Sequence, residues 1–559
     1  MAENKKKKKK KRNSGAGLAL AFVLSLLFCV YAPLELYLTN ISEFWMIPKM
    51  LVIPVAVVFL AVFAVLSIIF VVVNKINGTA YRVLTAVASG ALVGMYVQGN
   101  FLIKNLPDIN GVSIDWNSLP AERIKSIVAF VIPIIIFTVI ALKIKQTSFE
   151  KAVKIASACI SLLFAVTLTT LFITTDTSKE LSLVSTVKNE FQMSEDKNYI
   201  VLILDALDSG YFKEALEKDG ELKKELDGFT YYDDALAAYP YTTHAMPMIF
   251  SGSWYENDGS FSEYRVNALD NSPFINSLEQ QGYLIGIYDK CELDMKESRL
   301  TGRYENCFPG KINYFSEYTY LLVLKMGGIK YAPWDLKQFS YLDLENYMLR
   351  GKVSNSNEAA FSWSDSTFYT QLDSDDPFTK TDEKCAKIIH LEGAHVPYRY
   401  DKNVNRISTK LGTYEQNVEA CVTLTKRYIE KLKNSGVYDN SVIIIMGDHG
   451  YAGNDLKDEY NIKKRMNPAV LIKGINEKHA MKYSSAPISY TDLAEAFKKL
   501  ANEEKGDDIF YCKENEERSR RMILFVFNKE DKLKEYVTDG KANDPDAMTA
   551  TGNEYNIKK

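Results

Sequence analysis

The chain has 559 residues, of which 47% are hydrophobic and 25% are charged, and its formal net charge at neutral pH is −3. This length is sufficient for two or more domains. The near balance of acidic and basic residues excludes a protein that relies on overall positive charge to bind nucleic acid.

A basic tail is expected at residues 1–15. Lys5 to Arg12 form an unbroken cationic run directly before an apolar stretch. Binding of nucleic acid is one interpretation of such a run. Its position beside an apolar segment favours a cytoplasmic, lipid-facing tail that orients the chain in a membrane. We therefore expect a membrane partner and no nucleic-acid partner.

A transmembrane bundle is predicted at residues 16–175. Each of five apolar segments in this region approaches the roughly 20 residues that cross a bilayer. A cleaved signal peptide would explain only the first of them. The segments are residues 16–38, 49–74, 79–103, 124–143 and 152–174.

The charges of the loops predict the orientation of this bundle. Lys75 and Arg82, and later the lysines between positions 143 and 154, fall on the side of the basic tail, and the intervening loops are poorer in Lys and Arg. The positive-inside bias then places the N-terminus in the cytoplasm. Five crossings put the chain after about residue 176 outside the cytoplasm, as expected for a multi-pass protein of the cell membrane.

The rest of the chain is predicted to be a juxtamembrane linker at 176–197, an extracytoplasmic domain at 198–537 and a polar C-terminal tail at 538–559. Its apolar runs are continuous rather than alternating, which predicts an α/β domain with a mostly parallel, helix-covered sheet. The aromatic and polar stretch at 310–380 is interpreted as an insertion that shapes a substrate surface. The predicted strands are 199–204, 283–288, 386–391, 442–446 and 469–472, and the predicted helices are 418–433 and 492–501.

Acidic and histidine side chains follow three of these strands. Asp205 comes directly after the first strand, and Asp448 and His449 follow the fourth. The third strand carries His390 and runs on to His395. Since the carboxyl ends of parallel strands form the site in open α/β sheets, we expect these side chains to converge as metal ligands or catalytic groups. Asp205 alone could instead cap the following helix.

Two threonines open an apolar helical segment between Tyr239 and Gly252. A threonine at a helix N-terminus usually caps the helix, which would explain either Thr242 or Thr243. The same position can hold a transferred phosphate through free backbone N–H groups. A threonine hydroxyl becomes a competent nucleophile when a bound metal lowers its pKa. The segment therefore offers a candidate nucleophile.

Taken together, these motifs resemble the sulfatase/alkaline-phosphatase superfamily. They occur in the order Asp205, Thr242-Thr-His-Ala-Met-Pro247, His390-Leu-Glu-Gly-Ala-His-Val-Pro397 and Gly447-Asp-His-Gly450. The five apolar segments ahead of them are similar to the membrane branch of that superfamily, which contains lipoteichoic acid synthases and phosphoethanolamine transferases. The resemblance implies a five-helix transmembrane bundle followed by a sulfatase-like catalytic domain.

The resemblance also assigns roles to residues. The family nucleophile stands five residues before a proline, and counting back from Pro247 gives Thr242, with Thr243 as the second candidate. His395 matches the histidine that contacts the phosphate group, and His390, His244 and Thr243 are expected to bind substrate. His244 could instead pack at the start of its helix. The matching metal ligands are Asp205, Thr242, Asp448 and His449.

The chain departs from the family pattern at several points. Asp205 stands where the membrane transferases commonly carry glutamate, and Asp208 where they often carry arginine. The Cys-x-Pro-x-Arg motif of sulfatases is absent, which disfavours hydrolysis of sulfate esters. No second pair of aspartates completes a two-metal site, so one divalent ion is expected. The oxygen-rich ligand set favours Mn²⁺ and allows Mg²⁺ or Zn²⁺.

The expected function is that of a metal-dependent membrane phosphotransferase. It would move the headgroup of a phospholipid donor, phosphoglycerol or phosphoethanolamine, through a phosphothreonine at Thr242 to a glycan, polymer or lipid acceptor of the cell envelope. An exported phosphodiesterase or sulfatase-like hydrolase with the same site is one alternative. A catalytically inactive membrane scaffold is another, from a different class.

Overall fold

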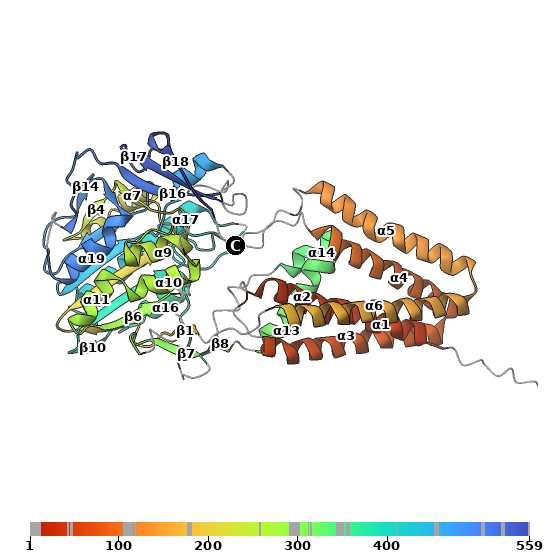
Figure 1. The fold of residues 1–559 in the computed structure, drawn as a ribbon. Helices are drawn as coiled ribbons and strands as arrows, with labels where there is room; N and C mark the ends of the chain where they lie inside the picture. The colour runs from red at the N-terminus through yellow and green to blue at the C-terminus, as the bar shows by residue number, and fades with distance from the viewer. Residues whose placement is uncertain are drawn as a thin grey trace, which may run out of the picture. The chain divides into compact units, whose positions relative to one another are not determined.

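Figure 1 shows the computed structural model of the chain, in which two compact units are distinguished. The first unit comprises Met1–Lys179 and Asn313–Met348, and the second comprises Glu180–Ile312 and Leu349–Lys559. The basic run at Lys5 to Arg12 lies outside the described residues. The structure describes residues 13–41, 44, 48–103, 116, 119–175, 182–256, 259–289, 302–310, 312–313, 316–341, 352–353, 358–409, 411–451, 458–504, 509–526 and 532–556.

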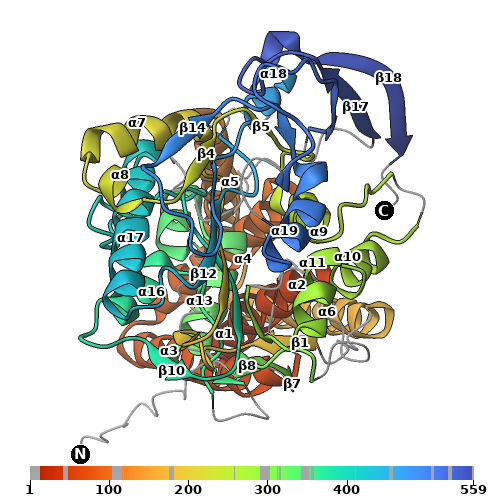
Figure 2. The ribbon, with the colours of Figure 1, turned by 90° about the vertical axis from the view of Figure 1, so that its left-hand side faces the viewer.

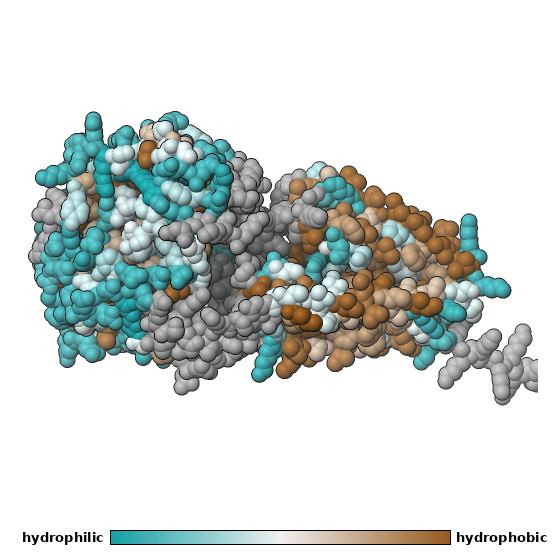
Figure 3. All heavy atoms as spheres, in the orientation of Figure 1, coloured by the Kyte–Doolittle hydropathy of each residue, from teal (hydrophilic) through white to brown (hydrophobic). Residues whose placement is uncertain are grey.

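The first unit contains five helical spans that are long and apolar enough to cross a membrane, which confirms the five predicted segments. They carry many exposed large apolar side chains, and Figure 3 shows hydrophobic atoms gathered over their surface. An outer surface of this kind suits contact with lipid. The spans are formed by α1 (Gly15–Leu26), the π-helical η1 (Leu27–Tyr31) and α2 (Ala32–Thr39) together, then α3 (Pro48–Ile76), α4 (Gly78–Phe101), α5 (Pro120–Lys143) and α6 (Gln146–Thr174).

A segment from much later in the chain completes this unit. The helices α13 (Ser316–Tyr331) and α14 (Trp334–Lys337) follow the first part of the sheet domain in sequence, yet α13 packs against α2 and α3. Tyr331 is buried against Gly99, where a Cβ would overlap its ring. Residues 313–348, within the domain expected over 198–537 and the insertion expected at 310–380, thus group with the helical unit, and the expected domain bounds stay a prediction. Small residues that admit close packing bring this part to the helical unit.

The second unit is built on a seven-stranded sheet with the order β14-β4-β13-β12-β3-β11-β6. All neighbours are parallel except for β13, which is antiparallel to both β12 and β4. This confirms the mostly parallel α/β sheet. Its strands are β3 (Asn198–Leu204), β4 (Thr230–Tyr232), β6 (Leu284–Tyr288), β11 (Cys385–Leu391), β12 (Ser441–Met446), β13 (Val470–Lys473) and β14 (Lys482–Ser484).

Helices cover both faces of this sheet, as Figure 2 shows. Alternate side chains of β3 belong to two separate cores, with Tyr199, Val201 and Ile203 in one and Ile200, Leu202 and Leu204 in the other. The first core contains α9 (Thr242–Ser251), α11 (Pro273–Gln280) and α19 (Leu493–Ala501), with α10 (Phe261–Asp270) beside α9. The second contains α7 (Ser209–Asp219), α8 (Leu222–Glu225), α16 (Asp365–Leu372) and α17 (Tyr414–Asn434). Burial on both faces explains why the strands read as continuous apolar runs.

The polar ends of the second unit are also folded. In the expected linker at 176–197, β1 (Ser182–Ser185) pairs with β7 (Cys307–Gly310), and β2 (Gln192–Ser194) pairs with β10 (Thr379–Thr381). The expected C-terminal tail at 538–559 contains β18 (Thr549–Asn556), which pairs with β17 (Lys532–Thr538), itself next to β16 (Arg520–Leu524). The remaining elements are β5 (Ala235–Leu236), β8 (Ile312–Asn313), β9 (Lys352–Val353), β15 (Ile488–Ser489), α18 (Glu459–Lys464), η4 (Gln338–Ser340), η5 (Tyr490–Asp492) and η7 (Pro545–Ala547).

Candidate active site

The predicted site residues meet at the carboxyl ends of β3, β11 and β12. These strands are neighbours and run in parallel, with Leu204 opposite Leu391 and Ile203 opposite Met446. Asp205 follows β3 directly, and Asp448 follows β12 after a single glycine. The edge at which they meet is where open α/β sheets place their sites.

Asp448 is held by the backbone around it. Its Oδ1 accepts hydrogen bonds of 2.9 Å from the N–H groups of Ala206 and His449. Ala206 reaches this position with φ of 56°, in the left-handed region that a non-glycine residue adopts only when its surroundings hold it there. Gly447 passes so close to the turn after β3 that a Cβ would lie 2.6 Å from the carbonyl oxygen of Leu207. The carboxylate of Asp448 therefore has a fixed orientation.

The second oxygen of Asp448 is available to a ligand. Oδ2 is buried and has no hydrogen-bond partner among the described residues. Burial and the neighbouring charge of Asp205 raise the pKa of Asp448 to about 7. Burial of a carboxylate oxygen without a partner raises the free energy of the folded chain, and a bound cation would offset this destabilisation.

His449 is fixed in the tautomer that a metal requires. Its Nδ1 lies 2.9 Å from the carbonyl oxygen of Gly450, which can only accept a hydrogen bond. The proton therefore belongs on Nδ1, and Nε2 carries the lone pair, toward which the Nη2 of Arg465 donates at 2.8 Å. Burial and the charge of Arg465 hold the pKa of His449 well below its usual value, so the ring is neutral. A neutral imidazole is the form that ligates metal ions.

Thr242 lies at the first turn of α9 and points at the same place. Its Oγ1 is 3.3 Å from His449 Nε2 and 3.3 Å and 3.4 Å from the two carboxylate oxygens of Asp205. Burial opposes ionisation of Asp205, but the charges of the surrounding histidines, His395 foremost, outweigh it and hold the pKa of Asp205 below its usual range. The hydroxyl thus faces an ionised carboxylate and a neutral imidazole.

The geometry fits a divalent cation. One ligand atom each from Asp205, Asp448 and His449 lie within 4.8 Å of one another, and all three residues are buried. Two carboxylates and a neutral imidazole form a donor set that suits Mn²⁺, Mg²⁺ or Zn²⁺. The unpartnered oxygen of Asp448 is the observation that such an ion would explain.

His390 lies behind this cluster, fully buried between two carboxylates. Its Nδ1 is 2.7 Å from Asp289 Oδ1, and its Nε2 is 3.7 Å from Asp205 Oδ2. Burial acts to lower the pKa of His390, but the two carboxylates outweigh it and raise the pKa well above its usual value. His390 therefore supports Asp205 as a buried cation. Asp289, which the sequence analysis missed, follows directly after β6 and could have been found by the same strand-end rule.

His395 stands half-buried on the turn after β11. Its Nδ1 contacts the carbonyl oxygen of Val396, and its ring centroid is 6.1 Å from that of Trp363. Because a carbonyl can only accept a hydrogen bond, Nδ1 is the donor, and Nε2 is the ring nitrogen that can interact with a substrate. Trp363 also lies against His390, with ring centroids 6.2 Å apart, so it connects His395 to the buried histidine next to Asp205.

Arg465 is a second residue that the sequence analysis missed. Its Nη2 lies 2.8 Å from His449 Nε2, and its guanidinium is 5.0 Å from the ring centroid of Tyr241. The side chain is buried, and the backbone carbonyl of Arg465 accepts the N–H of Gly450 at 2.7 Å. It adds a positive charge next to the Thr242 hydroxyl. No sequence motif predicts the position of Arg465, because this residue lies in an irregular segment between α18 and β13.

Thr243 and His244 make different contacts. Thr243 Oγ1 is 3.1 Å from His244 Nδ1, and the ring of His244 stacks on Phe261 at 4.4 Å with Phe525 at 5.0 Å. Burial and the charge of Arg265 lower the pKa of His244 to about 3. These contacts describe a packed, neutral side chain, the alternative already considered for His244. A role of either residue in binding substrate stays a prediction.

Comparisons with known proteins agree with this geometry. The family model described as Sulfatase matches residues 197–503. No curated protein matches the chain.

Several solved structures are similar to the chain in fold. One is a protein of the alkaline phosphatase superfamily from Vibrio parahaemolyticus, with 13% identity over 66% of this chain and 80% of that one at a TM-score of 0.32. Another is the lipoteichoic acid synthase LtaP from Listeria monocytogenes, with 13% identity over 65% and 87% at a TM-score of 0.34. A third is the phosphonate monoester hydrolase SpPMH from Silicibacter pomeroyi, with 13% identity over 63% and 88% at a TM-score of 0.33. Likeness at this level assigns no activity.

The matched segment spans more than half of the chain and contains the strand ends that carry Asp205, His395, Asp448 and His449, together with Thr242. Enzymes of this superfamily depend on metal ions, and the cluster of two aspartates and a histidine fits one. The chain therefore belongs to the sulfatase family, as an enzyme of the sulfatase and alkaline phosphatase superfamily with five candidate membrane helices ahead of its catalytic unit.

Proposed function

We propose that this protein is a metal-dependent phosphotransferase of the membrane, which moves a phospholipid headgroup to a cell-envelope acceptor through a phosphothreonine at Thr242. The observation that carries the proposal is the position of the Thr242 hydroxyl, 3.3 Å from both Asp205 and His449 at the first turn of α9. The headgroup is phosphoglycerol or phosphoethanolamine. The five candidate membrane helices support a lipid donor, because such a donor stays in the bilayer.

The residues of the site have different roles in the first step. Asp205, Asp448 and His449 would hold a divalent ion, preferably Mn²⁺, which when bound lowers the pKa of the Thr242 hydroxyl and neutralises charge on the phosphoryl group. The oxygen of Thr242 forms a bond to phosphorus as the ester bond to the diacylglycerol oxygen breaks. The free N–H groups at the start of α9 and the guanidinium of Arg465 stabilise the negative oxygens.

The second step reverses these roles. A hydroxyl of the acceptor forms a bond to the same phosphorus and the bond to Thr242 breaks. The threonine oxygen then takes up a proton from solvent, which replaces the proton that it released to solvent in the first step. His395 is the group to protonate the departing oxygen in the first step and to accept the proton of the attacking hydroxyl in the second. His390, held by Asp289 at 2.7 Å, keeps Asp205 ionised and oriented.

A headgroup-transfer assay tests the proposal against hydrolysis at the same site. The full chain in lipid nanodiscs is supplied with phosphatidylglycerol or phosphatidylethanolamine that is isotopically labelled in the headgroup, together with an envelope extract and Mn²⁺. Transfer predicts label in a larger acceptor and equimolar diacylglycerol. Release of free phosphoglycerol or phosphoethanolamine would identify a hydrolase instead, and no turnover with Mn²⁺, Mg²⁺ or Zn²⁺ would favour an inactive scaffold.

The catalytic unit is proposed to lie outside the cytoplasm, because the loop charges orient the helices that way. Labelling of single cysteines with a membrane-impermeant maleimide in intact cells tests this orientation. Cysteine in place of the exposed Lys478 is expected to react in intact cells. Cysteine in place of the exposed Lys145, between α5 and α6, is expected to react only after the cells are opened. The reverse pattern would contradict the orientation.

A further inference from the structure

A cavity with a volume of about 400 Å³ adjoins the turn that carries the metal-site residues. Asp208, at its edge, is three residues beyond Asp205, and Tyr451 is two residues beyond His449. The volume falls within the range of about 300–1,000 Å³ that is typical of small-molecule sites. The other lining residues are Gly210, Tyr211, Lys464, Asn467 and Asn543.

The aromatic wall of this cavity is formed by tyrosine rings that pack against one another. Tyr451 stacks face to face on Tyr414, with ring centroids 3.7 Å apart and an interplanar angle of 7°. Tyr211 stands nearly perpendicular to both rings, at 85° and 86°. The hydroxyl of Tyr414 donates to the carbonyl of Ala206 at 2.7 Å and accepts from the N–H of Asp208 at 3.0 Å. The wall is thus joined to the same turn that orients Asp448.

The polar residues that line the cavity include one negatively charged, one positively charged and two uncharged side chains. The carboxylate of Asp208 is held by the N–H groups of Gly210 and Tyr211, at 2.9 Å and 3.2 Å. The amide nitrogen of Asn467 is held by the carbonyls of Asp233 and Ala235. Lys464 and Asn543 are exposed at the rim.

The single cation and single carboxylate among these groups balance each other, which disfavours an anion as the ligand. A neutral molecule with many hydroxyls suits the combination better. Its hydroxyls can donate to Asp208 and accept from Lys464 and Asn543, while the C–H face of its ring packs on an aromatic ring.

We infer that this cavity binds a neutral saccharide ring, which presents its hydroxyl to the phosphoryl group at Thr242. The role as an acceptor rests on the proposed function, whereas the binding of a saccharide does not. Asn543 comes from the C-terminal segment that the sequence analysis expected to be a tail.

Saturation-transfer NMR on the full chain in a sugar-free detergent tests the inference, with maltose, lactose and chitobiose as the probes and glycerol 3-phosphate as the anionic comparison. At least one disaccharide is expected to bind through its ring protons, and glycerol 3-phosphate is not expected to displace it. Tyr211→Ala should weaken binding about 10-fold. Lys464→Ala, at an exposed position, should also weaken it if Tyr211→Ala fails to fold.

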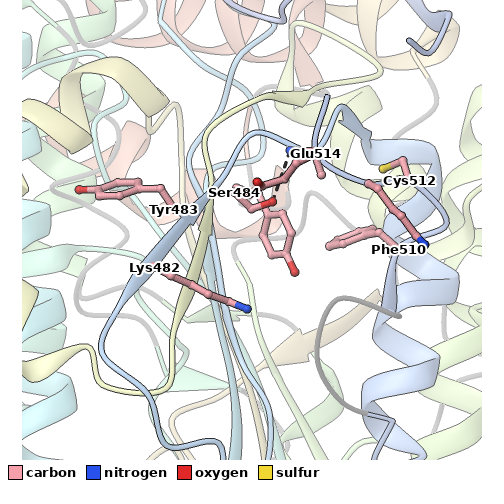
Figure 4. A pocket seen from close by; sticks show the side chains of 9 residues that line it. Lys482, Tyr483, Ser484, Phe510, Cys512 and Glu514 are labelled. Atoms are coloured by element: carbon pink, nitrogen blue, oxygen red, sulfur yellow. Dashed lines mark hydrogen bonds between the residues drawn. The ribbon is translucent and has the colours of Figure 1, made fainter. Parts of the chain in front are cut away.

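Matched variants control for general effects. Tyr511→Ala removes a tyrosine that is exposed and lies outside the cavity. Lys482→Ala removes a lysine that points into a different cavity, of about 490 Å³, beside β4 and β14 (Figure 4). Both should leave saccharide binding unchanged. Absence of binding by the parent chain, equal losses in the pocket and control variants, or displacement by glycerol 3-phosphate would overturn the inference.

The failure of this inference is distinguishable from failure of the proposed function. Thr242→Ala is expected to keep saccharide binding while it abolishes turnover of labelled lipid, because Thr242 does not line the cavity. Loss of saccharide binding in Thr242→Ala would place the sugar at the nucleophile and overturn the assigned cavity. Turnover of lipid, measured separately, decides only the proposed function.

Discussion

The hydroxyl oxygen of Thr242 lies 3.3 Å from Nε2 of His449, although the two residues are 207 positions apart in the chain. The start of α9 and the end of β12 are thus brought together at one edge of the sheet. Since the Nδ1 proton of His449 is directed to Gly450, the atom that faces Thr242 is the unprotonated nitrogen. This relationship places a hydroxyl where a bound metal ion would activate it.

Alanine substitutions should distinguish the role of Thr242 from that of Thr243. Thr242→Ala is expected to lower the turnover of labelled lipid at least about 10³-fold, because it removes the attacking oxygen. Thr243→Ala should retain activity within a few-fold, since its hydroxyl contacts His244. Initial rates of release of diacylglycerol measure both. Comparable losses in the two variants would contradict the assignment of the nucleophile.

Metal binding should depend on the buried cluster. Asp448→Asn is expected to weaken Mn²⁺ binding at least about 100-fold, because it removes the negative charge of one of the three ligands that lie close together. Asp458→Asn is the control, since Asp458 only caps the N-terminus of α18. Isothermal titration with Mn²⁺ on the full chain measures both variants. Retention of parental affinity in Asp448→Asn would exclude the proposed metal site.

Asp289 is predicted to act through His390. Asp289→Asn should remove the partner that holds the imidazolium at 2.7 Å, and thereby lower the pKa of His390 and the activity by about 10–100-fold. The ring signals of His390, followed by NMR over a pH titration, report the pKa change that a merely structural effect would not cause. An unchanged titration together with full activity would show that Asp289 does not position this ring.

Glu190 gives a prediction of pH dependence away from the site. Burial raises the pKa of this carboxyl to about 8, and nearby Lys387 only partly offsets the effect. Between its unfolded pKa of about 4.3 and this value, the folded chain holds a proton that the unfolded chain has lost. Stability of the parent should therefore fall as pH rises through this window, by up to about 1.4 kcal/mol per pH unit.

The isosteric change Glu190→Gln removes this titration. The variant is expected to gain thermal stability over the parent as pH rises from 5 to 8, with no further gain above pH 8. Glu195→Gln, at a position whose side chain is 57% exposed, serves as the control. Melting followed by tryptophan fluorescence at several pH values measures the difference. A constant difference across this range would contradict the raised pKa.

The strand ends could be predicted from the sequence because burial on both faces leaves an unmistakable apolar run before each functional residue. The ends of β3 and β12 at Leu204 and Met446 agree with the prediction. Asp289 follows β6 in the same way, but a single aspartate after a strand is also a common turn residue, so the pattern alone does not distinguish it. Arg465 has no such signal, since tertiary packing alone places it beside His449.

Other features could not be predicted for physical reasons. The strand β18 is exposed along almost all of its length, so its side chains are polar and give no apolar pattern. Its pairing is fixed by contacts such as those of Thr551 and Tyr555 with Glu535. The helix α13 joins the first unit through close approach of Gly327 to Phe28 and Gly99 to Tyr331, and sequence distance hides such contacts.

Mass spectrometry of the peptide that holds Thr242 tests the central claim most directly. The full chain is incubated with phosphatidylglycerol or phosphatidylethanolamine and Mn²⁺ in the absence of acceptor, and is then digested and sequenced. A phosphoglycerol or phosphoethanolamine group on Thr242, absent from Thr242→Ala, is the predicted result. Release of diacylglycerol with Thr242 unmodified at every time point would contradict the covalent mechanism.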